Sequence, residues 1–112
     1  MKDQLFFLPA DFQDDGAAWY CRECAEIRGL LTYYPQLGRQ VDVQVLDFPR
    51  PRARLVELLG EAHQNLPTLI IGDESGPPPA AAKQAKGRFF LDDAAGIGEY
   101  LAGKYGIGRP HP

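Results

Sequence analysis

The two cysteines of the chain stand three positions apart, in the sequence Cys21-Arg22-Glu23-Cys24. A thiolate is a nucleophile, and a second thiol at this spacing can displace it from a mixed disulfide. A Cys-x-x-Cys motif beside a strand–helix–strand pattern is typical of a redox site. Because the chain has no other cysteine, any thiol chemistry of this protein takes place at Cys21 and Cys24.

The two thiols are expected to have different environments. Apolar side chains recur at steps of three and four residues from Cys24 through Ile27 and Leu31, which predicts a helix that begins near Cys21. At a helix start, unpaired N–H groups and the positive end of the dipole favour a thiolate. We therefore predict Cys21 as the exposed nucleophile and Cys24 as the buried, resolving thiol.

Two other interpretations of the same motif stay open, an inert thiol pair and half of a metal site. Structural zinc takes four ligands. Besides the cysteines, the chain offers only His63 and His111, which lie far apart in the sequence. No metal site and no cofactor are predicted.

Seven regular elements are expected to position the cysteines. Apolar and β-branched runs predict four strands, at residues 5–8, 41–48, 68–71 and 88–91. Helical spacing predicts three helices, over about 21–34, around 55–62, and over 97–105 after a cap at Asp92 or Asp93. Residues 10–20 and 72–87 are predicted as loops. The order β-α-β-α-β-β-α predicts an α/β fold with a mixed four-stranded sheet and helices on both faces.

Composition restricts the class of protein further. The 112 residues fit a single domain, residues 1–112, and the net charge of −3 argues against nucleic-acid binding. The apolar run at 5–8 is shorter than the core of a secretory signal, about 7–15 residues, and no stretch reaches the ~18 apolar residues of a membrane span. We expect a cytoplasmic protein without a membrane partner, where paired cysteines are more often catalytic or metal-binding than structural.

Over nearly its whole length the chain resembles a minimal member of the thioredoxin-like superfamily. More narrowly, it is similar to a bacterial family of short thioredoxin-like proteins that has no assigned function. The similar segments are Pro9-Ala10-Asp11-Phe12, Cys21-Arg22-Glu23-Cys24, Phe48-Pro49-Arg50-Pro51-Arg52, Leu59-Gly60-Glu61-Ala62-His63-Gln64-Asn65-Leu66-Pro67 and Pro110-His111-Pro112. The resemblance implies a three-layer α/β/α sandwich.

The resemblance also implies a substrate site. Pro67 matches the cis-proline position of the superfamily, which would leave the backbone of Leu66 able to pair with an extended peptide or with glutathione. The alternative is a trans proline that merely begins a strand; we predict the cis bond. Trp19 and Tyr20 precede Cys21 and are expected to stack beside its thiol.

One segment departs from the pattern of classical thioredoxins, and the role of a second segment stays open. Eleven residues, Ala10 to Tyr20, separate Pro9 from the cysteine turn, and this insertion could shape the site or cover it. Arg50, Arg52 and Arg54 could grip a carboxylate or phosphate. The simpler interpretation of these arginines is a solvated surface with local ion pairs.

The last helix is similar to the end of the glutathione-transferase N-terminal domain. Asp93 stands where those enzymes hold the γ-glutamyl group of glutathione, but Ala94 replaces the serine of their motif. A helix cap explains Asp93 without a ligand.

The leading hypothesis is a thiol-disulfide oxidoreductase or redox sensor that acts on a disulfide-containing protein or on a small thiol such as glutathione. Its catalytic residues would be Cys21 and Cys24. The alternatives are a non-enzymatic thioredoxin-like binding module and a glutathione-binding domain.

Overall fold

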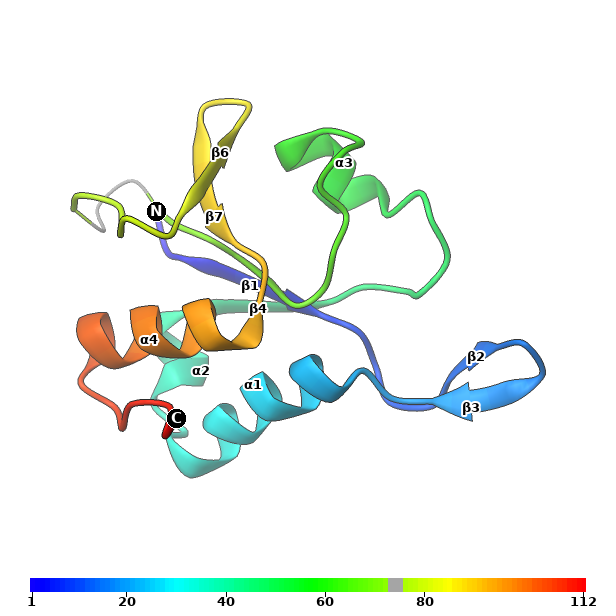
Figure 1. Cartoon of the computed structure of the whole chain (residues 1–112), viewed down its shortest axis with the longest axis horizontal. Helices are drawn as coiled ribbons and strands as arrows, with labels where there is room; N and C mark the ends of the chain where they lie inside the picture. Colours follow the sequence, from blue (N-terminus) through cyan, green and yellow to red (C-terminus); the bar gives the residue numbers. More distant parts are fainter. Residues whose placement is uncertain (73–75) are drawn as a thin grey trace.

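A five-stranded sheet forms the centre of the computed structural model, which describes residues 1–72 and 76–112 (Figure 1). Its strands are β1 (Gln4–Phe7), β4 (Asp42–Val45), β5 (Thr68–Ile70), β6 (Lys83–Ala85) and β7 (Arg88–Leu91). They lie in the order β4-β1-β5-β7-β6. β1 and β4 are parallel, whereas β1–β5, β5–β7 and β7–β6 are antiparallel pairs. The sheet is therefore mixed, as predicted.

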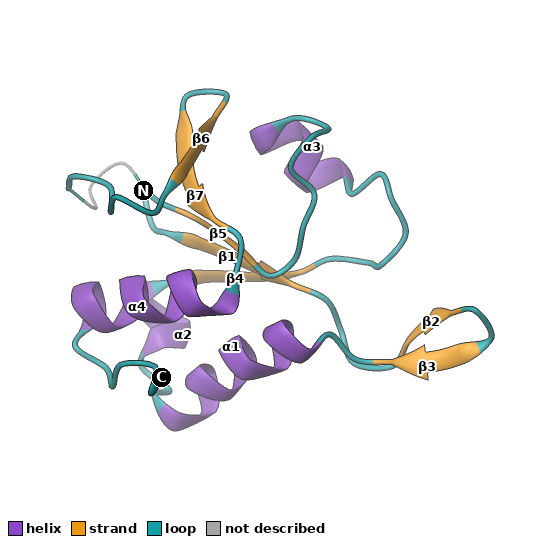
Figure 2. Ribbon diagram, in the orientation of Figure 1, coloured by secondary structure: helices purple, strands orange, loops and turns teal. Residues whose placement is uncertain are grey.

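Helices cover both faces of this sheet (Figure 2). They are α1 (Arg22–Tyr33), α2 (Leu37–Gln40), α3 (Ala53–Leu59) and α4 (Ala94–Tyr105). α3 lies on one side, and α1 and α4 pack together on the other. A strand covered on both faces needs apolar residues at successive positions. β1 lies between β4 and β5, and its residues Leu5, Phe6 and Phe7 are all apolar and fully buried. The predicted mixed α/β fold is confirmed.

The sheet has one strand more than predicted. β6 lies inside the predicted loop 72–87, of which residues 73–75 fall outside the described residues. It is an edge strand paired only with β7, and its polar sequence gives no apolar signal. The turn that joins them consists of Lys86 and Gly87, which have φ of 48° and 74°. Two residues with positive φ are typical of a tight hairpin turn.

The predicted loop at residues 10–20 is also a hairpin, made of β2 (Phe12–Asp14) and β3 (Ala17–Trp19). Its turn, Asp15-Gly16, has positive φ at both residues, and Asp-Gly is itself a hairpin signal. The hairpin projects from the body of the molecule (Figure 1). At its base, the ring of Phe12 stacks on that of Phe48 with centroids 4.5 Å apart.

A buried carboxylate fastens α4 to the beginning of β1. Asp3 is 0% exposed. Its Oδ2 accepts hydrogen bonds from the hydroxyls of Tyr100 (2.7 Å) and Tyr105 (2.8 Å) and from Nζ of Lys104 (3.0 Å). Its Oδ1 accepts from the backbone N–H of Gly72 (2.7 Å). Burial, and then the hydrogen bond to Asp3, raises the pKa of Tyr105, so its hydroxyl stays a donor at neutral pH.

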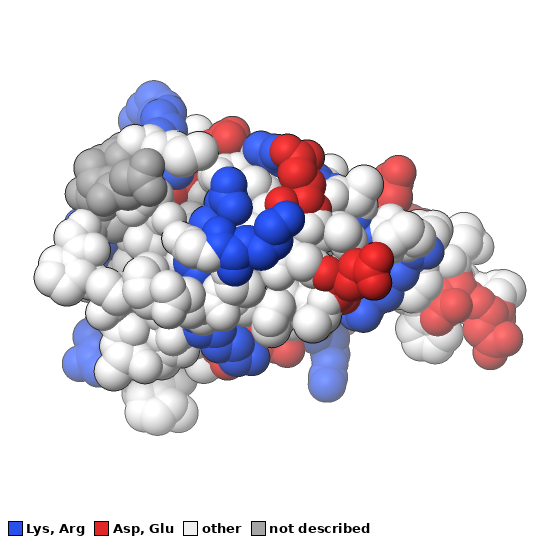
Figure 3. All heavy atoms as spheres, turned by 90° about the horizontal axis from the view of Figure 1, so that it is seen from above, with Lys and Arg blue, Asp and Glu red and all other residues white. Residues whose placement is uncertain are grey.

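The surface that carries α3 has no uniform charge. On this face, Lys and Arg side chains are interspersed with Asp and Glu (Figure 3). Within the described residues, no helix is both long enough and apolar enough to cross a membrane.

Candidate functional site

Cys21 is the N-cap residue of α1. Its backbone is extended, with φ −78° and ψ 118°, and its Sγ accepts the N–H of Cys24 at 3.0 Å. An N-cap side chain satisfies one of the N–H groups that the first helical turn leaves without a partner. The sulfur therefore lies at the positive end of the helix, as the periodicity predicted. Cys21 is half-buried.

Cys24 lies one turn further along α1 and faces the core. It is 4% exposed, and its sulfur accepts the N–H of Leu8 at 3.5 Å. Burial is the main cause that raises the pKa of Cys24 to about 12, and the hydrogen bond to the Cys21 side chain adds to it. Cys24 is therefore a neutral thiol at physiological pH. The predicted contrast in burial between the two cysteines is confirmed.

The fold brings the Leu66–Pro67 segment against the cysteine turn. The Leu66–Pro67 peptide bond is cis, as predicted. The thiol of Cys21 points at the carbonyl oxygen of Leu66, 3.8 Å away, although the two residues are 45 positions apart in the sequence. Two of the predicted site segments thus share one location.

Arg52 is buried and holds this segment in place. Only 7% of the residue is exposed, so the expectation of a solvated arginine is wrong at this position. Its backbone N–H donates to Oε1 of Gln64 (2.6 Å), and its Nη1 donates to the carbonyl of Gln64 (2.7 Å). Nε and Nη2 donate to the carbonyl of Phe48 at 3.1 and 2.8 Å. Since Gln64 precedes Leu66 by two residues, Arg52 fixes the backbone that reaches Cys21.

The other two arginines of this cluster behave differently. Arg50 is exposed. Arg54 makes the expected local ion pair, with Nη1 3.1 Å from Oε1 of Glu57. Burial and then the charge of Arg50 lower the pKa of Arg52, while thiolates at Cys24 and Cys21 would act in the opposite direction. Pairwise electrostatic interaction is mutual, so the charge of Arg52 favours the thiolate form of Cys24.

A small pocket opens beside the thiols. Its volume is about 200 Å³, and the lining residues are Leu8, Pro9, Ala10, Tyr20, Cys21, Cys24, Ala25 and Arg28. Tyr20 lines this pocket together with Cys21. Trp19 is not part of the lining: it belongs to β3, is half exposed, and donates its indole N–H to the carbonyl of Asp14 at 2.7 Å. The two predicted aromatic residues therefore occupy different surroundings.

The insertion does not fold over the cysteines. Its middle part is the projecting β2–β3 hairpin, and only the residues at its two ends, Ala10 and Tyr20, line the pocket. Arg28 was not predicted from the sequence. Its position four residues after Cys24, on the same side of a helix, is the signal that could have found it.

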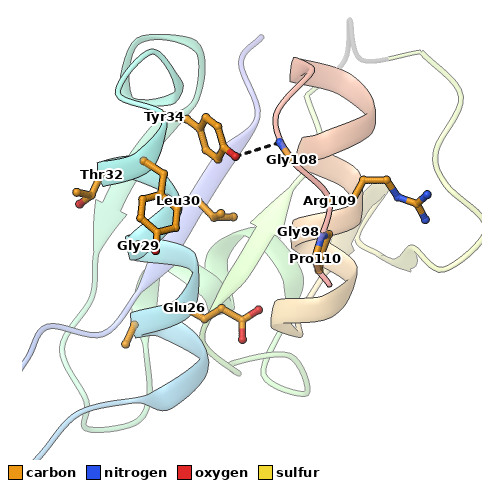
Figure 4. A pocket seen from close by; sticks show the side chains of 11 residues that line it. Glu26, Gly29, Leu30, Thr32, Tyr34, Gly98, Gly108, Arg109 and Pro110 are labelled. Carbon is orange, nitrogen blue, oxygen red and sulfur yellow. Dashed lines mark hydrogen bonds between the residues drawn. The ribbon is translucent and has the colours of Figure 1, made fainter. Parts of the chain in front are cut away.

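A larger pocket, of about 600 Å³, lies between α1 and the C-terminal tail (Figure 4). The tail closes one side of it, where the hydroxyl of Tyr34 accepts the N–H of Gly108 at 3.2 Å. A Cβ at Gly98 would lie 2.8 Å from the ring of Pro110, so this close approach requires glycine. Neither cysteine lines this pocket. It offers no nucleophile beside an activating group, so the thiol site is the better candidate for chemistry.

The remaining candidates from the sequence have structural partners. Asp93 caps α4 by accepting the N–H of Gly96 at 2.6 Å, as predicted, and Glu23 accepts the N–H of Ala94 at 2.7 Å. The ring of His63 packs 4.9 Å from that of Phe90. Across the described residues, no group of three or more His, Cys, Asp and Glu side chains could hold a metal ion.

A family model described as "Protein of unknown function (DUF3088)" matches residues 2–109. The chain belongs to the DUF3088 family. Neither a curated protein nor a solved structure matches it. The matched range of this DUF3088 chain includes the cysteine turn, the Leu66–Pro67 segment, Arg28 and Arg52.

Proposed function

We propose that this DUF3088 chain is a thiol-disulfide oxidoreductase, or a redox sensor that uses the same chemistry, with Cys21 as nucleophile and Cys24 as resolving thiol. The observation that carries the proposal is the position of the Cys21 sulfur. It caps α1 by accepting the Cys24 N–H at 3.0 Å and lies 3.8 Å from the Leu66 carbonyl, at the edge of a pocket. Such an arrangement suits a thiolate that attacks a disulfide.

The proposal includes a thioredoxin-like fold. Without the β2–β3 hairpin, α2 and the edge strand β6, the elements follow the order β1-α1-β4-α3-β5-β7-α4. The corresponding strand order is β4-β1-β5-β7, with only β1 and β4 parallel. This order of elements agrees with the order that the sequence predicts. The agreement supports a four-stranded core, with β6 as a further strand at its edge.

The proposed reaction has two steps. The Cys21 thiolate attacks one sulfur of a disulfide R–S–S–R, so a Cys21–sulfur bond forms as the S–S bond breaks and one thiolate leaves. The Cys24 sulfur, after losing its proton to solvent, then attacks the Cys21 sulfur and expels the second thiolate. Both leaving thiolates take up a proton from solvent, which balances the two protons that Cys21 and Cys24 release to it. The protein dithiol is oxidised by two electrons, and the disulfide is reduced to two thiols.

The environment of Cys24 changes between the two steps. While Cys21 is reduced, its hydrogen bond and its charge both raise the pKa of Cys24, in addition to burial. Once the Cys21 sulfur is part of a mixed disulfide, it carries no charge. One of the causes that hold Cys24 protonated is then removed, and the buried cation Arg52 favours its thiolate.

The proposed substrate is a disulfide-containing protein or a small disulfide, and the proposed location is the cytoplasm. There, cellular thiols would return the oxidised pair to the dithiol form. A glutathione-binding domain has less support, because Asp93 already caps α4 and the N–H of Ala94 is bound by Glu23.

The test is the stoichiometric oxidation of the reduced protein by bis(2-hydroxyethyl) disulfide, a small neutral compound. We expect one equivalent to be consumed per chain, with loss of both titratable thiols and formation of an intramolecular disulfide detected by mass spectrometry of peptides. Unfolded protein at the same concentration serves as the control. A folded protein that keeps both thiols while the unfolded chain is oxidised would contradict the proposal and favour a binding module.

A further inference from the structure

Arg28 brings a positive charge into the pocket that holds the thiols. It lies four residues after Cys24 on α1, and its side chain lines the same cavity as Cys21. The guanidinium carbon is 5.4 Å from the centroid of the Phe7 ring, which is fully buried. A cation above an aromatic ring is attracted to the ring's negative face. This contact holds the side chain of Arg28 against the protein.

The charge of Arg28 is not neutralised by a carboxylate among the described residues. The rest of the pocket lining is apolar apart from the two thiols and the hydroxyl of Tyr20. Arg28 is therefore the one ionic group in this cavity whose charge is fixed at physiological pH.

We propose that this pocket binds the carboxylate-bearing arm of a small disulfide, and that Arg28 is the residue that determines this specificity. The inference rests on the proposed oxidoreductase function and names its substrate class. A guanidinium binds a carboxylate through two parallel hydrogen bonds, which also orients the ligand. A carboxylate held there directs the attached sulfur towards Cys21. A volume of about 200 Å³ suits one short arm of such a molecule better than a folded polypeptide.

Other charges act on an anionic substrate from further away. The chain has a net charge of −3, and Asp14 and Asp15 lie at the turn of the projecting hairpin. Their repulsion slows the approach of any anion and is screened over about 10 Å at moderate salt. This repulsion is the same in the wild type and in variants of Arg28. The ratio of the wild-type rate to the variant rate with the same anionic disulfide therefore isolates the effect of Arg28.

The test uses three disulfides with the same ethylene arm and different end groups. They are 3,3′-dithiodipropionate (anionic), bis(2-hydroxyethyl) disulfide (neutral) and cystamine (cationic). Each is mixed with reduced protein in a single turnover, in which Cys21 and Cys24 supply both electrons and two small thiols are released. The rates are divided by those of dithiothreitol with the same compounds, because the disulfides differ in intrinsic reactivity.

For the wild type, we expect the normalised rate with the anionic disulfide to exceed that with the neutral one by roughly fivefold, as for a favourable exposed ion pair. The cationic disulfide should be the slowest. Arg28→Gln should remove the preference, measured within that variant as the ratio of the normalised rate with the anionic disulfide to that with the neutral one. Added salt should weaken the preference of the wild type.

Arg22→Gln is the matched control. Arg22 is exposed and adjacent to Cys21 in the sequence, but it does not line the pocket. The proposal predicts that Arg22→Gln keeps the anionic preference. An equal loss in both variants, or a wild type without any preference, would overturn the role of Arg28 while the oxidoreductase function stands. A folded wild type that reduces none of the three compounds would overturn both.

Discussion

Replacing Cys21 by serine should reduce disulfide exchange by the folded protein to the rate of buffer alone. A serine hydroxyl does not ionise at neutral pH, and the remaining thiol, Cys24, is 4% exposed; burial, the main cause that raises its pKa, stays in place in the variant. Cys24 therefore cannot replace the missing nucleophile. The loss should be equal for anionic, neutral and cationic disulfides, because it affects the attacking atom and not the binding of substrate.

Cys24→Ser is the matched variant, and its outcome should be different. The first step remains, so a mixed disulfide between Cys21 and one half of the substrate should accumulate and be visible in the intact mass. Without a resolving thiol the second step cannot follow. If Cys21→Ser still reduced disulfides, or if Cys24→Ser formed no adduct, the assignment of the two roles would be wrong.

Replacing Asp3 by alanine should lower the free energy of unfolding by about 3 kcal/mol, because a single hydrogen bond to a charged group contributes about 1.5–3 kcal/mol and the partly exposed donors regain water. The substitution removes the acceptor that Tyr100, Tyr105 and Lys104 share, together with the acceptor of the Gly72 N–H. The buried N–H of Gly72 and the half-buried hydroxyls of Tyr100 and Tyr105 would keep a cost of desolvation without a hydrogen bond in return.

Urea unfolding at neutral pH measures this effect, with Asp47→Ala as the control. Asp47 is exposed, and its replacement should change stability by less than about 0.5 kcal/mol. Equal midpoints for the two variants would show that the Asp3 cluster does not fasten α4 to the sheet. Because α4 packs on α1, we also expect Asp3→Ala to weaken the protection of α1 amides against hydrogen exchange.

The elements that carry the core could be predicted because their signals are local. The run at Leu5 to Leu8 predicts a strand covered on both faces, and helical spacing from Cys24 to Leu31 predicts α1. The strands that were missed have three residues each, which is too short for an alternating pattern to be recognised. Their signal was in the turns, Asp15-Gly16 and Lys86-Gly87, where positive φ is required.

Buried charges were the least predictable feature, because their partners are distant in sequence. Asp3 is bound by residues about a hundred positions away, and Arg52 depends on the carbonyl groups of Gln64 and Phe48. Asp and Arg side chains are mostly exposed in folded proteins, so the residue types alone predict a surface position for both. Only the assembled fold reveals the carbonyl and hydroxyl groups that make burial possible.

The candidate site was predictable where a motif defines it. Cys21 and Cys24 follow from the Cys-x-x-Cys spacing, whereas Leu66 and Pro67 were predicted from the resemblance to the thioredoxin-like superfamily. Tyr20 was predicted beside the thiol and lines its pocket. Trp19 was also predicted there, but it is the last residue of β3 and its indole N–H donates to the carbonyl of Asp14.

The most direct test of the central claim is the order in which the two thiols of the folded wild type react with iodoacetamide at neutral pH, assigned by mass spectrometry of peptides. The arrangement predicts that Cys21 is alkylated first. Cys24 should react only at alkaline pH or after unfolding, because its buried thiol has a pKa of about 12. Alkylation of Cys24 before Cys21, or of both at the same rate in the folded protein, would contradict the assignment of Cys21 as the nucleophile.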